Sequence, residues 1–371
     1  MNKKVELLYR SRIKKRLNRF FYGNRRKFLK TIFSWKTFLF ILHLSSLVFF
    51  KKSSWAGYPF TQADTGSRSI TGSKTPRSKV LIVKNNSLVD PSTGNISPIV
   101  LKKMINRGMM ALTGQKEISS CWKKFFSPND IVGIKVNCLG GRMIATHPEL
   151  VTVIMEGLRK AGIPDNQIII WDRLTEELKK AGYRTNLRSR GVKCFGTDAV
   201  GYDPIPELVG SIGSCFSKII STHCTALINV PVLKDHDLAG VSLGMKNFFG
   251  AIHNPNKYHD SNCNPYVADL NSHPYIKNKL RMVVLDGITA QCNGGPAYNA
   301  KWNWNYSGIL VSRDPVALDR IGTKIIEEQR KKEGLLPLNQ VKRYPQYIST
   351  AARLHLGESD IEKIEVTDIL T

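Results

Sequence analysis

The chain has few acidic residues, and it lacks the spaced cysteines and glycine-rich loops that mark several common functions. None of its seven cysteines forms a C-x-x-C pair, so its spacing encodes neither a ferredoxin-type iron–sulfur cluster nor a zinc ribbon. A Walker motif and a G-x-G-x-x-G motif are also missing. An odd number of cysteines leaves at least one thiol unpaired within a monomer. The cofactor therefore stays unknown, with a transition metal possible.

The shortage of acidic residues is concentrated at one end of the chain. The 371 residues include 55 Lys or Arg against 29 Asp or Glu, for a net charge of +26. Residues 1–55 hold 15 of the basic residues and a single acidic one, Glu6. The remainder has 40 basic and 28 acidic residues and is only moderately basic. We therefore expect no nucleic-acid partner.

The N-terminal segment carries an export pattern. Residues 24–30 read N-R-R-K-F-L-K and lead into an apolar run at 37–50. This resembles a twin-arginine signal, and Ser54-Trp-Ala56 is a small-x-small pattern that permits cleavage before Gly57. The twin-arginine translocation machinery is therefore an expected partner, and a periplasmic or otherwise extracytoplasmic location is expected.

An uncleaved anchor is the alternative reading of the same segment. Residues 32–50 approach the length that a membrane span needs. They include Lys36 and His43, however, and a central lysine is costly in a span. Under this alternative the protein is anchored in the inner membrane, and membrane contact is expected only through this N-terminal segment.

Three parts follow from this pattern: a signal peptide or anchor at 1–56, a polar linker at 57–78 and one large domain at 79–371. Within the domain, apolar strand-like runs alternate with helical ones. The pattern predicts an α/β fold, with a largely parallel or mixed sheet and helices on both faces. Strands are expected at 79–83, 131–137, 168–172, 227–230, 282–286 and 308–312, and helices at 98–112, after Thr146, at 176–181 and at 315–329.

Polar residues stand where these strands end. In largely parallel sheets, ligands gather beyond the carboxyl ends of the strands. Asp314 precedes Pro315 and is best explained as a helix N-cap, whereas Asp286-Gly287 reads equally well as a turn. The residues expected along this rim are Asn137, Asp172, Lys234, His236, Asp286 and Asp314.

A glycine-rich stretch at 238–250 follows, with Lys246-Asn247 as its strongly polar pair. Gly240 is a candidate start for a helix whose free N–H groups hold an anion. Beyond it, His253 and His259 stand six residues apart, with Asp260 and then Cys263 after the second histidine. Together with His236 these histidines are candidate metal ligands, although a polar loop with solvated histidines is the alternative.

Eight short blocks occur along the domain: VGIKVN at 132–137, VPVLKxH at 230–236, GMKNFFG at 244–250, YH at 258–259, ADL at 268–270, LDG at 285–287, GGP at 294–296 and SRDPVALD at 312–319. In these blocks and their order the sequence resembles the domain of unknown function 362 family. That resemblance implies an α/β protein of bacteria or archaea, often with a twin-arginine signal and sometimes fused to a ferredoxin-like module, whose cysteine runs this chain lacks. It implies no reaction.

Three functions are consistent with these patterns: an exported metal- or redox-cofactor enzyme acting on an anionic small molecule, a binding protein for such a molecule, and a structural or partner protein. The first is the leading hypothesis. Its expected catalytic residues are His236, Lys234 and Asp286, its ligand-binding residues Lys135, Asn137, Asp172, Lys246, Asn247 and Asp269, and its metal ligands His236, His253 and His259.

Overall fold

The computed structural model describes residues 78–371, so the expected signal segment, anchor and most of the linker lie outside the described residues. The first described residue, Ser78, already belongs to strand β1, one residue before the expected start of the domain. No helix within residues 78–371 is long and apolar enough to cross a membrane.

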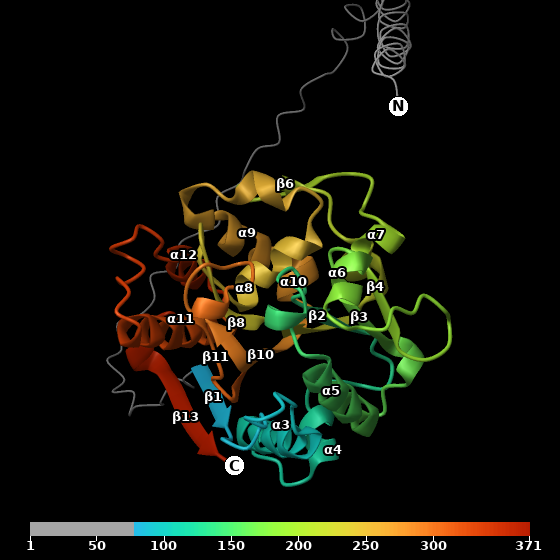
Figure 1. The fold of residues 1–371 in the computed structure, drawn as a ribbon. Helices are drawn as coiled ribbons and strands as arrows, with labels where there is room; N and C mark the ends of the chain where they lie inside the picture. The colour runs from blue at the N-terminus through green and yellow to red at the C-terminus, as the bar shows by residue number, and fades with distance from the viewer. Residues whose placement is uncertain (1–77) are drawn as a thin grey trace, which may run out of the picture. The chain divides into compact units, whose positions relative to one another are not determined.

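The predicted α/β architecture is confirmed by an eleven-stranded mixed sheet. Its main path runs β13-β1-β12-β10-β7-β2-β3-β4. Strands β8 and β11 pair with β10, and β9 pairs with β8; Figure 1 shows β8, β10 and β11 together near the centre of the fold. Its strands are β1 (Ser78–Lys84), β2 (Val132–Val136), β3 (Ile168–Asp172), β4 (Lys193–Gly196), β7 (Ala226–Val230), β8 (Val232–His236), β9 (Gly240–Ser242), β10 (Leu280–Gln291), β11 (Asn303–Trp304), β12 (Gly308–Ser312) and β13 (Ile364–Leu370). A separate hairpin joins β5 (Glu207–Val209) and β6 (Ile212–Ser214).

Parallel pairing dominates the part of the sheet that holds the candidate site. Strands β7, β2, β3 and β4 run parallel to one another, and β10 runs parallel to β7 and β8. Strand β12 is antiparallel to both β10 and β1. The carboxyl ends of β2, β3 and β8 therefore meet at one edge, as the strand-end pattern required.

Helices cover both faces of the sheet, as predicted. Successive strand residues point to opposite faces, so Ile134 packs in one core and its neighbour Lys135 projects toward the other. The first core lies under α3 (Pro98–Thr113), α4 (Ile118–Lys123) and α5 (Pro148–Ala161). The second contacts α8 (Gly244–Asn247), α9 (Tyr266–Ser272), α10 (Pro274–Lys277), α11 (Pro315–Lys332) and α12 (Tyr347–Arg353). Helices α6 (Thr175–Lys180) and α7 (Thr197–Val200) lie near β3 and β4 (Figure 1).

Helix starts show which capping predictions hold. Ser97 caps α3, and Asp314 caps α11 by accepting the N–H groups of Val316 and Ala317 at 2.8 and 2.9 Å. The capping box expected at Thr146 is wrong, because the N-cap of α5 is His147. The Thr146 hydroxyl instead accepts the N–H of Asn137 and donates to the Val230 carbonyl, which ties three segments together.

All seven cysteines are free thiols, and six of them are buried. Burial raises the pKa of Cys194 and Cys224 to about 12 and that of Cys292 to about 11. These three thiols are therefore kept in their protonated form.

Candidate functional site

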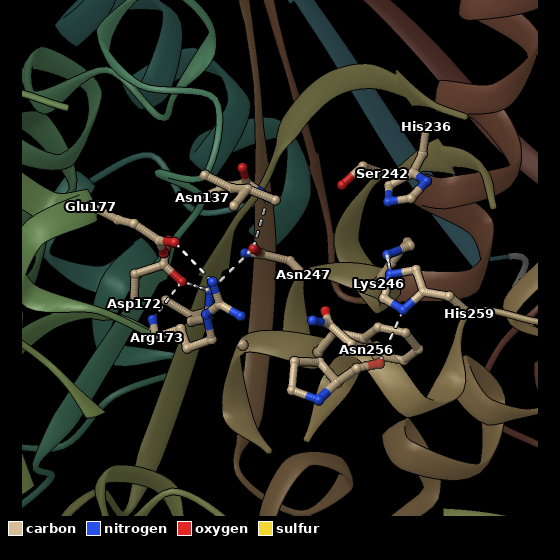
Figure 2. Close-up of a pocket in the computed structure, with 15 residues that line it drawn as sticks. Asn137, Asp172, Arg173, Glu177, His236, Ser242, Lys246, Asn247, Asn256 and His259 are labelled. Carbon is tan, nitrogen blue, oxygen red and sulfur yellow. Dashed lines mark hydrogen bonds and ion pairs between the residues drawn. The ribbon is translucent and has the colours of Figure 1, made fainter. Parts of the chain in front are cut away.

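A cavity of about 200 Å³ opens at the carboxyl ends of β2, β3 and β8. Figure 2 shows its two walls, with His236, Ser242, Lys246 and His259 on one side and Asp172, Arg173 and Glu177 on the other. Its lining residues are Lys135, Asn137, Leu139, Asp172, Arg173, Glu177, His236, Ser242, Lys246, Asn247, Phe249, Gly250, Pro255, Asn256 and His259.

A buried ion pair forms one wall. The Nζ of Lys135 donates to Oδ1 of Asp172 at 2.7 Å, to the Val136 carbonyl at 2.7 Å and to Oδ1 of Asn247 at 3.2 Å. The other oxygen of Asp172 accepts the Cys138 N–H at 2.7 Å. The opposite charges of Lys135 and Asp172 make the pair neutral overall. Lys135 is fully buried and donates all three of its ammonium N–H groups, so its partners hold it in place.

An amide network joins this pair to α8. The Oδ1 of Asn247 also accepts Nδ2 of Asn137 at 3.1 Å, and its own Nδ2 donates to Asn229 at 2.8 Å. These bonds fix which end of the Asn247 amide faces the ion pair. They also fix the position of the preceding residue, Lys246.

The start of α8 is held by a carboxylate from α11. Asp319 is fully buried, and its two oxygens accept the N–H groups of Gly244 at 2.7 Å and Met245 at 3.0 Å. Burial raises the pKa of Asp319 to about 7, although the two N–H donors oppose that rise. The expected anion site at a glycine-led helix is therefore occupied by a side chain of the same chain, and Gly240 belongs to strand β9 instead.

Lys246 contributes a cation that has no acidic partner. Its Nζ is 3.2 Å from Nε2 of His259 and lies 4.6 Å from the ring centre of Phe249. Within residues 78–371 no carboxylate lies within ion-pair distance of it. Burial lowers the pKa of Lys246 to about 8, so the ammonium and the free amine both exist near neutral pH.

The tautomer of His259 follows from its two contacts. Its Nδ1 lies 3.0 Å from the carbonyl oxygen of Pro255, which accepts hydrogen bonds only. Nδ1 therefore carries the proton, and Nε2 accepts an N–H from Lys246. Burial and the charge of Lys246 lower the pKa of His259, which keeps the ring neutral.

His236 presents the opposite tautomer to the cavity. Its Nδ1 accepts the N–H groups of Leu238 at 3.1 Å and Ala239 at 3.3 Å, so the proton lies on Nε2. Burial, and then the charge of Lys246, lower the pKa of His236 to about 2. Oδ1 of Asp237 is 2.9 Å from the same Nδ1, but a neutral ring forms no ion pair with it. The rings of His236 and His259 stack with their centres 5.6 Å apart.

Charges at the opposite wall cancel. Nη2 of Arg173 donates to Glu177 at 2.9 Å, one helical turn apart. With Lys135 paired to Asp172 and both histidines neutral, the cavity lining in the described part of the chain retains one unpaired positive charge, on Lys246. The arrangement can hold one anionic group and move a proton between Lys246 and His259.

Two of the expected catalytic residues lie elsewhere. Lys234 is fully buried and donates to the carbonyls of Ile144 at 3.3 Å and Pro296 at 3.2 Å, which ties two loops to β8. Asp286 accepts the N–H of His147 at 2.8 Å and its Nδ1 at 2.9 Å. The structure therefore does not bring Lys234, His236 and Asp286 together around one cavity.

His147, the partner of Asp286, lines a second cavity of about 430 Å³ beside the start of α5. Burial acts against the charged imidazole, but the carboxylate of Asp286 outweighs it and raises the pKa of His147. The sequence pattern pointed to Asp286 but missed His147, which was assigned to a capping box.

Asp269 and His253 also lie away from the first cavity. Asp269 accepts the N–H and hydroxyl of Ser211 at 2.7 and 2.6 Å and so fixes the β5–β6 turn. His253 is exposed and packs edge-to-face on Tyr202. His236 and His259 therefore meet without His253, and residues 78–371 contain no group of three or more His, Cys, Asp or Glu placed to hold a metal ion.

Other lining residues were missed by the sequence reasoning, among them Arg173, Glu177, Ser242 and Asn256. Arg173 had a usable signal, since it directly follows the strand-end residue Asp172. No sequence signal pointed to Ser242, because the hairpin formed by β8 and β9 was not predicted.

These features define a mixed α/β protein with a small polar cavity at the carboxyl edge of its parallel strands. Residues 132–324, a little over half of the chain, match the family described as domain of unknown function (DUF362), and the chain belongs to this family. No curated protein gives a match. Among solved structures, the crystal structure of a Thermotoga maritima protein is similar at 11% identity and a TM-score of 0.39, with 64% of this chain and 59% of that protein covered.

Proposed function

We propose that the chain is an exported enzyme that binds a small anionic molecule at Lys246 and transfers a proton to or from it. The observation that carries this proposal is the unpaired Lys246 ammonium inside the cavity, in contact with a neutral histidine. A buried charge without a counter-ion is costly, and an anionic ligand would supply that counter-ion. His259 would accept or return the proton, and Nε2–H of His236 would donate a hydrogen bond.

Anion binding is tested by thermal denaturation of the full chain in phosphate, acetate or malonate. We expect at least one of these anions to raise the melting temperature of the wild type and of a Lys160→Met control, which removes an exposed lysine that does not line the cavity. The shift should vanish in Lys246→Met. Equal shifts in both variants would contradict binding at Lys246.

Export through the twin-arginine pathway is part of the proposal and rests on residues 24–56. Replacing both Arg25 and Arg26 with lysine keeps the charge but removes the paired arginines. Cell fractionation should then show the full chain retained in the cytoplasm, whereas the unchanged protein reaches the periplasm. Recovery of the unchanged protein in the inner membrane would favour the anchor at 32–50 instead.

A metal or redox cofactor at His236 and His259 is the second candidate. The observation that favours it is the pair of stacked, neutral imidazoles on one wall of the cavity. Two imidazoles leave most metals incompletely coordinated, so the bound anion would have to supply further ligands. His236 would bind a metal through Nε2 only after its proton moves to Nδ1, where Oδ1 of Asp237 lies 2.9 Å away. Elemental analysis and an absorption spectrum of the exported protein test this candidate. Stoichiometric metal or colour that is lost in His236→Ala/His259→Ala would support it, and a colourless, metal-free folded protein would leave anion binding without a cofactor.

A binding protein without chemistry, and a structural or partner protein, are the remaining alternatives. Both would share the fold. A pure binder would keep the anion-dependent melting shift and show no His259-dependent reaction, and a structural protein would show neither.

A further inference from the structure

Three lysines are buried in and around the candidate site, and their partners differ. Lys135 is paired with a carboxylate and also donates to a carbonyl and an amide. Lys234 donates to two backbone carbonyls and does not line the first cavity. Lys246 lines the cavity and has one side-chain partner, the unprotonated Nε2 of His259.

These differences bear on nucleophilicity. An amine attacks only in its neutral form, and it needs a nearby group to take up its proton. A carboxylate partner keeps Lys135 in the ammonium form, and carbonyl partners occupy the N–H groups of Lys234. The contact of Lys246 is a neutral imidazole nitrogen at 3.2 Å, which is a base. Burial lowers the pKa of both Lys234 and Lys246 to about 8, so Lys246 differs by its position in the cavity and its contact with a base.

We propose that Lys246 forms an imine with a small carbonyl compound that carries a carboxylate, a 2-oxo acid being the simplest case. This rests on the anion-binding function proposed above, since the carboxylate is what draws the molecule into the cavity. Once Lys246 is an imine, the carboxylate would face Arg173, which lines the same cavity and gives one N–H to Glu177.

The step balances with groups already present. The lone pair of the neutral Nζ attacks the carbonyl carbon, and Nε2 of His259 takes one proton from Nζ and passes it to the carbonyl oxygen, which becomes a hydroxyl. His259 then takes the second proton from Nζ and gives it to this hydroxyl, which leaves as water. The carbon–oxygen double bond is replaced by a carbon–nitrogen double bond, and one water molecule is released, with no oxidation or reduction.

Borohydride trapping tests the imine. The full chain is incubated with pyruvate or glyoxylate at pH 8, reduced with sodium borohydride, and analysed by intact mass and by peptide mapping. We expect one covalently attached molecule per chain, mapped to Lys246, and none without borohydride. Lys135 and Lys234 in the same digest serve as internal controls, because both are buried but neither presents a free amine to the cavity. His259→Gln should slow the trapping at least tenfold while circular dichroism shows the same fold.

The outcomes separate this inference from the function on which it rests. Labelling of Lys246 supports both. If Lys246 stays unlabelled with both oxo acids while these acids still raise the melting temperature in a Lys246-dependent manner, the imine is wrong and anion binding stands. If Lys246 stays unlabelled and neither the oxo acids nor phosphate, acetate or malonate raise the melting temperature, both are wrong. Labelling spread evenly over surface lysines also contradicts the imine.

Discussion

Oδ1 of Asp319 in α11 accepts the backbone N–H of Gly244 in α8 at 2.7 Å, across 75 residues of sequence. The neighbouring Met245 N–H binds the second oxygen of the same carboxylate. The position of Lys246 in the cavity therefore depends on a carboxylate that does not line the cavity.

Asp319→Asn should destabilise the protein by about 1–3 kcal/mol at pH 5, because the carboxyl is protonated there and its second oxygen can still accept an N–H, whereas the amide would turn an NH2 group toward one of the two buried N–H donors. The pKa of Asp319 is raised to about 7 in the native state, so the native state holds this proton more tightly than the unfolded chain. The wild type therefore loses stability as the pH rises from about 4 to 7, and the variant does not. Urea denaturation at pH 5 and pH 8 should show a smaller cost at pH 8. Asp165→Asn, at an exposed ion pair, is the control and should change little.

Lys246→Met should stabilise the protein at pH 7 while abolishing anion binding. The native pKa of Lys246 is about 8 against an ordinary 10.5, so the unfolded chain binds this proton more tightly. The resulting destabilisation of the wild type is full below pH 8 and disappears as the pH rises toward 10.5. The lowered pKa of Lys246 corresponds to a gain in unfolding free energy of about 3 kcal/mol at most for the variant. Loss of the hydrogen bond to His259 reduces this gain. Denaturation across pH 7–10 measures it, and a variant less stable than wild type at pH 7 would contradict the unpaired buried charge.

Gly250→Ala should destabilise the protein by about 1–3 kcal/mol. An added Cβ would lie 3.1 Å from Nζ of Lys135 and from Oδ1 of Asp172, and the buried ion pair has no room to move. Gly213→Ala is the matched control, because its Cβ would also meet an atom at 3.1 Å, the end of the exposed Leu208 side chain. We expect Gly213→Ala to change stability by no more than about 0.5 kcal/mol. If Gly250→Ala and Gly213→Ala lost the same stability in thermal or urea denaturation, the ion pair would have moved to make room for the added Cβ.

Three histidines should titrate differently in long-range nitrogen–proton NMR spectra assigned with single His→Gln variants. His147 should titrate above pH 6.5, because Asp286 stabilises its charged form. His259 should titrate below pH 6.5, and His236, with a pKa of about 2, should remain neutral down to pH 4. The nitrogen shifts should also place the proton of His236 on Nε2 and that of His259 on Nδ1. A His236 titration near pH 6.5 would mean that solvent reaches this ring.

Apolar patterns predicted most of the central strands, because strands buried on both faces read as continuous apolar runs. This pattern did not predict strand β8, because Lys234, Asp235 and His236 are polar and yet all buried. Their burial depends on partners such as Ile144, Gly295 and Arg343, which are distant in sequence. No local pattern encodes those partners.

The sequence pointed to some residues of the candidate site and not to others, because some contacts depend on partners distant in sequence. The strand-end residues Asn137 and Asp172 line the first cavity, as do Lys246 and His259 from the family blocks. Asp286 lies outside the first cavity, and its partner His147 lines the second one. Which cavity a strand-end residue lies near depends on packing between distant segments, which sequence spacing does not determine.

The burial of the thiols bears on whether the chain should fold before or after it is exported. An oxidising compartment pairs cysteines readily in an unfolded polypeptide, and seven thiols offer many wrong pairs. In the folded protein the thiolates that would react are suppressed by burial. Under the proposed export, a chain that crosses the membrane already folded arrives with its thiols shielded, whereas a chain threaded through unfolded would meet the oxidant first. Folding before transport would thus act as chemical protection for the cysteines.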